Sequence, residues 1–482
     1  MTSVRQPQSL CEFGFARCDI TPPVGIYHRM WGAATHDRAT GVHRPLFASA
    51  MVFRSADDSE TEHAVIALDH VLLWANEMQT LLDAISSDSG LSPQQISITF
   101  SHTHAAGLMG LERTELPGGD LIPEYLDTLG KSLADIVRQA RANMQPASIT
   151  YGTGKCTLAC HRDFWDEQTQ QFVCGYNPDG PADDTLLVAR IANMSGKPLT
   201  VVVNYACHPT TLAWGNTLIS PDFPGVTCAF VEEQSGIPCV FLQGASGDLG
   251  PREGYVADPA VAERNGRQLG YAALATLESL APPLTRFDYD GPVISGATLG
   301  TWSHQPLAED DRKSSQVQRQ RQWHVDLPYK PDLPTVIQTE TDMKSWEEKE
   351  RSAKQAGNES EAKDCRAMVE RMRRRLIHLQ SLPSGPAFPF PIKLYQMGDA
   401  LWLFVEAELY SWFQTTLRAR FPKVPMIVVT LTNGSRPWYL PIKDAYGKGI
   451  YQESISPLAS GCLETLADAI AEEIQTWDIA SK

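Results

Sequence analysis

Several absences narrow the class of this protein before any motif is considered. No window approaches 18 uninterrupted apolar residues, and the first residues contain no apolar segment of the kind that a secretory signal needs. The chain has no cluster of lysine and arginine, and its formal net charge of −16 argues against nucleic acid as a partner. We therefore expect a cytoplasmic protein without an integral membrane segment that acts on a small molecule. The sequence leaves open whether it forms a homo-oligomer.

The cysteines do not form a disulfide framework. The ten cysteines are scattered, and several lie in apolar runs, which is typical of buried free thiols. No internal repeat or low-complexity tract is evident. The fold must therefore be stabilised by an ordinary apolar core, which 482 residues can readily supply.

What the sequence does contain is a repeated order of apolar strand, polar loop and amphipathic helix. This order predicts an α/β fold, a mixed β-sheet core flanked by helices, with functional groups gathered at strand ends. The predicted strands are 46–54, 64–69, 96–100, 200–205, 238–243, 401–405 and 426–431, and the predicted helices are 76–85, 123–144, 225–235, 259–280, 408–421 and 457–477. A loop rich in Gly, His and Arg, residues 27–44, is a further candidate for lining a site.

Residues 303–386 depart from this pattern because they are highly charged. Within them, residues 343–379 indicate a long solvated helix or a helix pair. We expect a charged helical insertion in one catalytic domain that spans residues 1–482. The insertion would serve as a lid over the site, as an oligomer contact or as surface decoration.

The strand predicted at 96–100 leads directly into Ser101-His-Thr-His104. In extended backbone, residues i and i+2 point to the same side, so His102 and His104 are expected to project together past the end of the strand. Two adjacent imidazoles suit a metal ion and a proton-transfer partner. The competing interpretation is a polar strand end with two solvated histidines.

A second apolar strand, 200–205, also runs into a histidine, His208. Catalytic zinc usually takes three protein ligands and leaves one position for water. Histidines at two strand ends therefore favour a shared metal site, although His208 alone could be a buried core histidine.

Carboxylates and a tyrosine complete the set of candidates. Asp222 and Asp248 lie in tight loops, where a role in a local turn is the simpler interpretation. Glu408 follows an apolar strand, where a carboxylate is costly unless it is paired or bound to metal, and Glu406 is its close rival. By composition alone, Tyr439 is an aromatic residue in a turn.

Together these motifs resemble the catalytic domain of the neutral/alkaline non-lysosomal ceramidase family, which are zinc-dependent amidases. The resemblance covers most of the chain outside 303–386. It rests on Asp19-Ile-Thr-Pro-Pro, Ser101-His-Thr-His104, His161-Arg162, Asn204-Tyr-Ala-Cys-His208, Ile219-Ser-Pro-Asp222, Gln243-Gly-Ala-Ser-Gly-Asp248, Val405-Glu-Ala-Glu408 and residues 433–451.

The resemblance implies a zinc site and assigns a role to each matched residue. The implied ligands of Zn²⁺ are His102, His208, Glu408 and Tyr439. The implied catalytic residues are His104, Arg162 and Tyr451. The tyrosine ligand falls on Tyr439 because a second family tyrosine, twelve residues later, then falls on Tyr451. We also expect Asp222 and Asp248 to accept the remaining ring N–H groups of the ligating histidines.

This chain departs from the family in three places. Glycine, Gly250, stands where the family has a serine in Gly-Asp-x-Ser-Pro. Because the sequence ends soon after the last predicted helix, we do not expect the family's C-terminal immunoglobulin-like domain. Residues 303–386 carry no motif of the family. These departures make ceramide itself a doubtful substrate.

The sequence therefore predicts a zinc-dependent hydrolase of a C–N bond, amide or lactam-like, in a small or acylated substrate. An esterase or lactonase with the same metal centre is one alternative, because only the leaving group differs. A TIM-barrel amidohydrolase also carries His-x-His at a strand end, but it would show eight βα units. A catalytically inactive homologue that binds metal or ligand is the alternative from a different class.

Overall fold

The computed structural model of the protein describes residues 2–55, 62–477 and 479, and its core is an eight-stranded mixed sheet. Pairing is antiparallel in the middle of the sheet and parallel between the outermost two strands at each edge. The order across the sheet is β14 (Cys239–Gln243), β12 (Pro198–Tyr205), β11 (Thr185–Asn193), β7 (Gln145–Lys155), β2 (Gln8–Asp19), β4 (Phe47–Arg54), β5 (His63–Leu68) and β6 (Ile96–Phe100). This sheet rules out the TIM-barrel alternative, which requires eight parallel strands.

A second, four-stranded sheet packs on one face of the first. Its order is β18 (Gln318–Pro328), β19 (Ala387–Met397), β20 (Ala400–Val405) and β22 (Met426–Val429). Large side chains from both sheets form one core between them, with Phe13 and Phe53 from the first sheet and Trp402 and Phe404 from the second. Both faces of β5, β6 and β14 are covered, so every residue of these three strands is buried.

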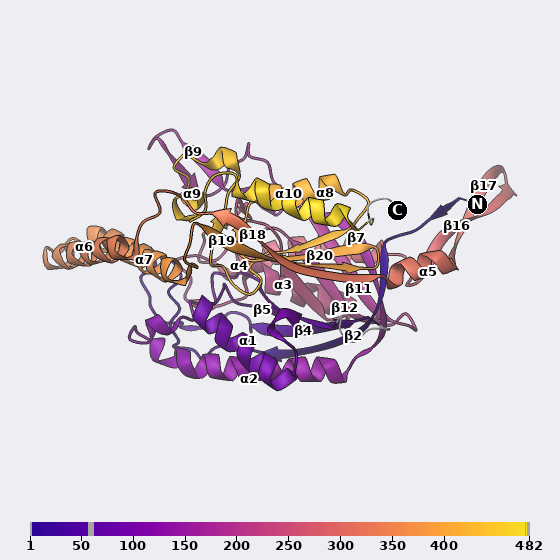
Figure 1. Ribbon diagram of the computed structural model, residues 1–482, viewed down its shortest axis with the longest axis horizontal. Coiled ribbons are helices and arrows are strands. Elements are labelled where there is room, and N and C mark those ends of the chain that lie inside the picture. The colour runs from indigo at the N-terminus through magenta and orange to yellow at the C-terminus, as the bar shows by residue number, and fades with distance from the viewer. Residues whose placement is uncertain (1, 56–61, 478, 480–482) are drawn as a thin grey trace.

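Helices cover the outer faces of the two sheets, so the molecule is built in layers (Figure 1). The first sheet is covered by α1 (Ala75–Ser89) and α2 (Ile122–Ala142) over one part and by α3 (Asp222–Ser235) and α4 (Pro259–Glu278) over another. The second sheet is covered by α8 (Trp412–Arg420) and α10 (Cys462–Gln475). The predicted α/β class, a mixed sheet flanked by helices, is confirmed.

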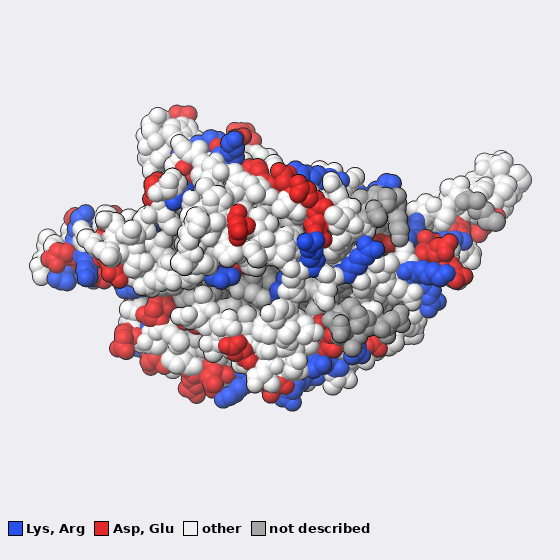
Figure 2. Space-filling view, in the orientation of Figure 1, with Lys and Arg blue, Asp and Glu red and all other residues white. Residues whose placement is uncertain are grey.

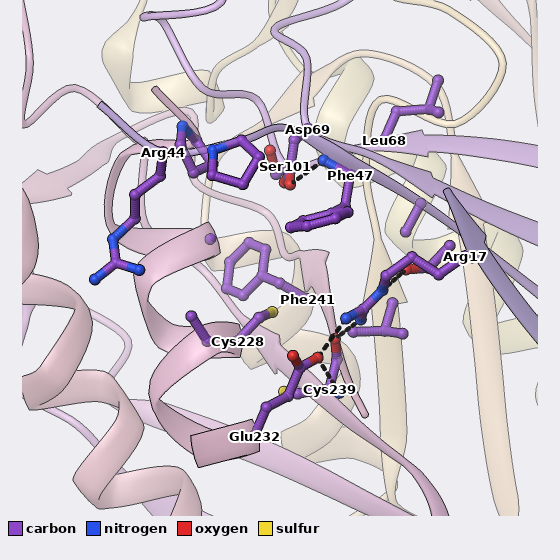
Figure 3. A pocket seen from close by; sticks show the side chains of 17 residues that line it. Arg17, Arg44, Phe47, Leu68, Asp69, Ser101, Cys228, Glu232, Cys239 and Phe241 are labelled. Atoms are coloured by element: carbon purple, nitrogen blue, oxygen red, sulfur yellow. Dashed lines mark hydrogen bonds and ion pairs between the residues drawn. The ribbon is translucent and has the colours of Figure 1, made fainter. Parts of the chain in front are cut away.

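The large sheet curls so that its edges approach each other, and this curl positions the site. Strands β6 and β14 are at opposite ends of the strand order, yet they are in contact. A small cavity of about 70 Å³ shows the same curl, because residues of β2, β4 and β5 line it together with α3 and β14 (Figure 3). There Arg17 of β2 donates hydrogen bonds to Glu232 of α3 and to the carbonyl oxygen of Cys239.

The chain after β22 joins the two edges of the curled sheet. The backbone N–H of Thr430 donates to the carbonyl oxygen of Gln243 at the end of β14, at 3.0 Å. Asn433 exchanges hydrogen bonds with β6: its N–H donates to Ile98 at 2.8 Å, and its side-chain oxygen accepts from Ile98 at 2.7 Å. The strand ends that carry His102 and His208 are thereby brought to one place.

Residues 303–386 are not helical throughout, which corrects one expectation. A helix pair does form, α6 (Val336–Gln355) and α7 (Glu359–Ser381). Before it come the end of a hairpin made by β16 (Thr285–Ser295) and β17 (Ala297–Pro306), then α5 (Glu309–Gln316), and then β18, which is an edge strand of the second sheet. The α6–α7 helix pair and the β16–β17 hairpin both project from the body of the molecule (Figure 1). Charges of both signs cover the end of the helix pair, whereas the tip of the hairpin is uncharged (Figure 2).

The remaining elements are short. They are β1 (Ser3–Val4), β3 (Gly41–Val42), β8 (Ala159–His161), β9 (Asp163–Asp166), β10 (Gln171–Cys174), β13 (Leu218–Ile219), β15 (Leu249–Pro251), β21 (Glu408–Leu409), β23 (Tyr439–Leu440) and α9 (Tyr451–Ile455). The helix predicted to begin at residue 408 begins instead at Trp412, because Glu408 and Leu409 pair with β23. In the part of the chain that the structure describes, every helix is too short or too polar to cross a bilayer.

Candidate metal centre

His102 lies two residues beyond the end of β6 and is 1% exposed. Its φ of +66° takes the backbone out of the extended conformation, so the alternation assumed in the sequence analysis does not apply here. The ring Nδ1 lies 2.7 Å from the carbonyl oxygen of Val71. Because a carbonyl only accepts, Nδ1 carries the hydrogen, and the neutral ring therefore presents a lone pair at Nε2.

His208 follows β12 and is arranged in the same way. It is 1% exposed, and its Nδ1 lies 3.0 Å from the carbonyl oxygen of Ser246, so its Nε2 also presents a lone pair. The Nε2 atoms of His102 and His208 lie only 3.1 Å apart. Burial, followed by the nearby charge of Arg162, lowers the pKa of His208 to about 3.

Glu408 brings a buried carboxylate to the two imidazoles. Its Oε2 lies 3.3 Å from Nε2 of His102 and 3.1 Å from Nε2 of His208. Burial disfavours the charged form of this carboxylate, so the charged form needs a positive partner beside it. Ala407, with a φ of +73°, turns the chain so that Glu406 points elsewhere and forms an ion pair with Arg436 at 2.8 Å. Because of this turn, Glu408 and not Glu406 is the candidate metal ligand.

Tyr439 reaches the cluster because β23 pairs with β21 in parallel, with Tyr439 in register with Glu408. Its hydroxyl lies 3.4 Å from Nε2 of His208. Burial, followed by the charge of Glu408, raises the pKa of Tyr439 well above its usual value. The preceding residue, Trp438, has a φ of +56°. Like His102 and Ala407, it holds an unusual backbone conformation, of a kind that clusters at functional sites.

These four side chains present converging acceptor atoms, which is what a cation requires. Two imidazole lone pairs and a carboxylate oxygen within 3.3 Å of one another repel unless a positive charge lies between them. Ligands at zinc distances in tetrahedral geometry lie about 3.3 Å from one another, close to the observed 3.1–3.4 Å separations. Nitrogen and oxygen donors of this kind fit a divalent transition metal such as zinc.

His104 belongs to the same cluster, but in the part of the chain that the structure describes its second ring nitrogen lacks the carbonyl partner that fixes His102 and His208. Its Nε2 lies 3.4 Å from Nε2 of His102, and the three histidines form a group whose ring nitrogens fall within 4.8 Å of one another. However, its buried Nδ1 has no hydrogen-bond partner among the described residues. Burial, together with the neighbouring His102 and His208, lowers the pKa of His104 well below its usual value.

A cavity of about 410 Å³ opens onto the cluster. His104, His208 and Tyr439 face it from the metal-binding side. The other side chains named for this site that line it are Arg162 and Tyr451. The rest of its wall comes from Trp31, Gly32, Cys174, Thr210, Trp214, Tyr255, Ala367, Glu370, Arg371, Arg374, Trp438 and Ile455. Trp31 and Gly32 come from the loop 27–44 that the sequence analysis selected as a candidate lining.

Arg162 is buried beside the cluster. Its Nη2 donates to the carbonyl oxygen of Gly247 at 2.7 Å, and its guanidinium lies 5.5 Å from the ring centroid of Tyr439. Its Nε is buried without a partner in the described residues. The ring of Tyr451, at the start of α9, lies 5.9 Å from that of Tyr439 and is 41% exposed. Both side chains can therefore reach a molecule in the cavity.

The acidic residues predicted to support the histidines have other roles. The acceptors of the ring N–H groups are the carbonyl oxygens of Val71 and Ser246 rather than Asp222 and Asp248. Asp222 accepts from the backbone of Leu212, at 2.9 Å. Asp248 accepts from the backbone and hydroxyl of Ser411, at 2.6 and 2.8 Å. No sequence pattern reveals a backbone acceptor, because any residue type offers one.

Gly250 is not required by packing. A Cβ atom at this position would meet Thr210 Oγ1 at 3.7 Å, which is ordinary van der Waals contact. The sequence reasoning also missed the arginines of α7 that line the cavity, since they resemble the solvated charges on the rest of that helix.

The fold and the cluster define a mixed α/β protein with a candidate metal centre, and comparisons identify the family. The model of the family described as "Neutral/alkaline non-lysosomal ceramidase, N-terminal" matches residues 12–251. The chain belongs to this family. Neutral ceramidases B and A of Dictyostelium discoideum are 24% and 26% identical to it over 287 and 290 residues, each covering 53% of this chain. The matches span 38% and 39% of those two proteins.

A solved structure shows the same fold. The crystal structure of neutral ceramidase from Pseudomonas aeruginosa matches 99% of this chain and 74% of its own, with a TM-score of 0.66 and 15% identity. A structure described as ceramidase complexed with C2 matches with a TM-score of 0.64 and 15% identity, covering 99% of this chain and 75% of its own.

Proposed function

We propose that this protein is a zinc-dependent hydrolase that cleaves an amide bond in a small or acylated molecule. The observation that carries the proposal is the convergence of two imidazole lone pairs, a carboxylate and a phenol hydroxyl beside a cavity. Family membership supports amide hydrolysis, because the matched relatives are named ceramidases.

The proposed ligands are His102, His208, Glu408 and Tyr439. Histidines that bind metal almost always donate their other ring N–H to an acceptor, which fixes the ring and its tautomer. His102 and His208 do so, to two carbonyl oxygens, whereas His104 has no such partner. This difference supports a role for His104 in the reaction and for the other two histidines as metal ligands.

When bound, zinc supplies Lewis-acid chemistry and lowers the pKa of a water ligand to about 7. In the cavity, Arg162 donates hydrogen bonds to the amide carbonyl oxygen as negative charge develops on it. His104 passes a proton to the leaving nitrogen, which must be protonated to depart as an amine. The hydroxyl of Tyr451, at the cavity wall, holds the substrate by a hydrogen bond. The water oxygen ends in the carboxylate product, so no serine is needed and Gly250 is compatible with the reaction.

Ester or lactone hydrolysis is the second candidate, because the same residues would serve a leaving alcohol. An alkoxide leaves more readily than an amine nitrogen, so His104 would matter less. Matched amide and ester substrates with the same acyl group separate the two. If the enzyme is an amidase, His104→Gln should lower amide hydrolysis by about 10²–10⁴-fold and ester hydrolysis by less.

The proposal is tested by elemental analysis of the purified wild-type protein beside His208→Ala. We expect about one zinc per chain in the wild type and its loss in the variant, together with loss of amide hydrolysis. His324→Ala, which changes an exposed histidine of β18, is the matched control and should keep both. Wild-type protein without bound metal, or a zinc-free variant with full activity, would contradict the proposal.

A further inference from the structure

One wall of the cavity is formed by α7, and this wall is rich in guanidinium groups. Glu370, Arg371 and Arg374 of α7 all line the cavity. Glu370 is the sole carboxylate among the lining residues, and it is already shared among three arginines. It pairs with Arg113 at 2.8 Å, with Arg374 at 2.9 Å and with Arg373 at 3.5 Å. Its single negative charge cannot neutralise the wall.

Arg371 is the least compensated of these groups. Within residues 2–55 and 62–477 it forms no ion pair, and its Nη2 donates to the hydroxyl of Ser454 at 2.9 Å. Its Nε is buried without a hydrogen-bond partner in the same part of the chain. Buried donors in folded proteins are normally paired, so an unpaired one beside a cavity indicates that a ligand supplies the acceptor.

The unpaired donors extend around the cavity. The Nε of Arg162 also lacks a partner among the described residues, and this side chain faces the same space. Arg162, Arg371 and Arg374 together give the lining three positive charges against the one carboxylate of Glu370. Guanidinium groups bind carboxylate, phosphate and sulfonate through strong, directional hydrogen bonds. The charge and the free donors both select an anion.

Another part of the wall is aromatic. Trp31 packs against two further rings, with centroid distances of 6.2 Å to Trp214 and 5.7 Å to Tyr255. It also lies 5.2 Å from the ring of His104, so this aromatic surface borders the reacting side of the cavity. Such a surface accommodates an apolar acyl chain.

We propose that the substrate is an acylated amide that carries an anionic group, which Arg371 and Arg374 bind while the acyl chain packs on Trp31, Trp214 and Tyr255. This inference rests on the proposed amide hydrolase for its reaction. The anion-binding part is independent of that reaction, because it follows from the charge of the α7 wall. A carboxylate and a phosphate share the required chemistry, and matched probes distinguish them.

The test measures equilibrium binding by calorimetry with analogues that cannot be hydrolysed. 4-Oxononanoate is the ketone analogue of hexanoyl-glycine, and 4-oxononanamide is its neutral counterpart. We expect the wild-type protein to bind the anion about tenfold or more tightly than the amide, the ratio that charge-assisted hydrogen bonds provide. The same comparison between 4-oxononyl phosphate and 1-hydroxynonan-4-one, the ketone analogues of hexanoyl-ethanolamine phosphate and hexanoyl-ethanolamine, shows whether phosphate is preferred.

The variants Arg371→Gln and Arg374→Gln should each reduce the preference for the anion to less than about threefold. Arg373→Gln is the matched control, since Arg373 also pairs with Glu370 but does not line the cavity, and it should keep the preference. Repeating the titrations after removal of the metal with a chelator separates attraction of the anion by the arginines from its coordination by the metal. A preference that survives chelation and disappears in Arg371→Gln supports the proposal.

Three results would overturn it: equal binding of both analogues to the wild type, an unchanged preference in both arginine variants, or a preference that chelation abolishes. Parallel hydrolysis assays with hexanoyl-glycine and hexanoyl-glycinamide keep this inference distinct from the proposed function. Selective binding without hydrolysis would support the anion site and contradict the hydrolase. Equal hydrolysis of both amides together with equal binding of both analogues would support the hydrolase and contradict the anion site.

Discussion

The candidate metal-binding side of the cavity and the α7 wall present opposite kinds of hydrogen-bonding atoms. The former, made of His102, His208, Glu408 and Tyr439, presents acceptor atoms that face one another, and each ring is fixed by a backbone carbonyl or by strand pairing. The latter presents donor atoms on a helix that is attached through ion pairs. The first arrangement suits a cation and the second suits an anion, in line with our two proposals.

Under our proposals, this difference separates the residues that carry out the reaction from those that recognise the substrate. The acceptor side is assembled from strand ends and from the segments that follow them, so its geometry is set by the curl of the large sheet. The α7 wall belongs to a projecting helix pair inside residues 303–386, where the sequence shows no motif of the family. If both proposals hold, a change in this one helix would alter the substrate without altering the residues that carry out the reaction.

The largest effect is expected from Glu408→Gln, which removes a charge from the acceptor side. Loss of even an indirect partner of a ligand costs about 10–100-fold in metal affinity, so zinc affinity should fall by more than about 100-fold and activity should fall with it. Elemental analysis and amide hydrolysis measure the two effects.

Glu406→Gln is the control, because Glu406 is equally buried but pairs with Arg436. It should keep zinc and lose stability instead. If Glu406→Gln lost the metal while Glu408→Gln kept it, the assignment of the two glutamates would be wrong.

The next effect is on stability and concerns the attachment of α7. Glu370→Gln removes the buried carboxylate partner of the fully buried guanidinium of Arg113 and leaves only the less buried Glu112, at 3.1 Å. Breaking a buried pair costs up to about 3–5 kcal/mol at pH 7. Urea unfolding measures it. Glu348→Gln, which breaks an exposed pair with Arg351 on α6, is the control and should cost less than about 1 kcal/mol.

This stability effect should also depend on pH. Burial would raise the pKa of Glu370, but Arg374 and Arg113 outweigh it and lower the pKa from 4.5 to about 2. Because the folded pKa is the lower one, the carboxylate stabilises the fold above pH 4.5, and this contribution is lost as the pH falls towards 2. The difference between wild type and Glu370→Gln should therefore shrink over that range. A difference that stays constant with pH would show that packing, not charge, is responsible.

A smaller effect is expected for Arg162→Gln, which removes a donor that touches the substrate but not the metal. Loss of one donor to a developing oxyanion typically lowers kcat by about 10²–10³-fold. Zinc content should stay at the wild-type level, and Arg252→Gln, on an exposed neighbouring arginine, should leave kcat unchanged. Loss of zinc in Arg162→Gln would instead indicate that this residue supports the metal site.

The smallest effect concerns the contact between the two sides. His378 of α7 stacks on Trp438, with ring centroids 3.7 Å apart and planes 12° apart, directly before Tyr439. His378→Leu should cost about 1 kcal/mol of stability through loss of this stacking. A double-mutant cycle with Trp438→Leu measures the coupling. A coupling near zero would mean that the acceptor side and the α7 wall are energetically independent.

Much of the fold could be predicted because its signals are local. The apolar runs at 200–205 and 401–405 appear as β12 and β20, and the amphipathic segment at 123–144 appears as α2. The helix expected from residue 408 was wrong in its first turn, because pairing of Glu408 with Tyr439 overrides local propensity. That partner lies thirty-one residues away, beyond the reach of periodicity.

The candidate site divides in the same way. Histidines at two strand ends are visible in the sequence, but the expectation that Asp222 and Asp248 support them failed. The true acceptors are the backbone carbonyls of Val71 and Ser246, and carbonyls leave no trace in residue types. The arginines of α7 were visible only as part of a charged segment, and nothing in their spacing separates the face that lines the cavity from the solvated one.

Local periodicity located most of the core strands and helices and the chemical groups that follow the strand ends, because the periodicity of side chains is a property of neighbouring residues. The tertiary structure alone decided that β6 and β14 meet, that Ala407 turns Glu408 rather than Glu406 towards the histidines, and that α7 places arginines at the cavity. Each of these depends on contacts between residues far apart in the chain, formed only when the sheet curls and the helix pair docks.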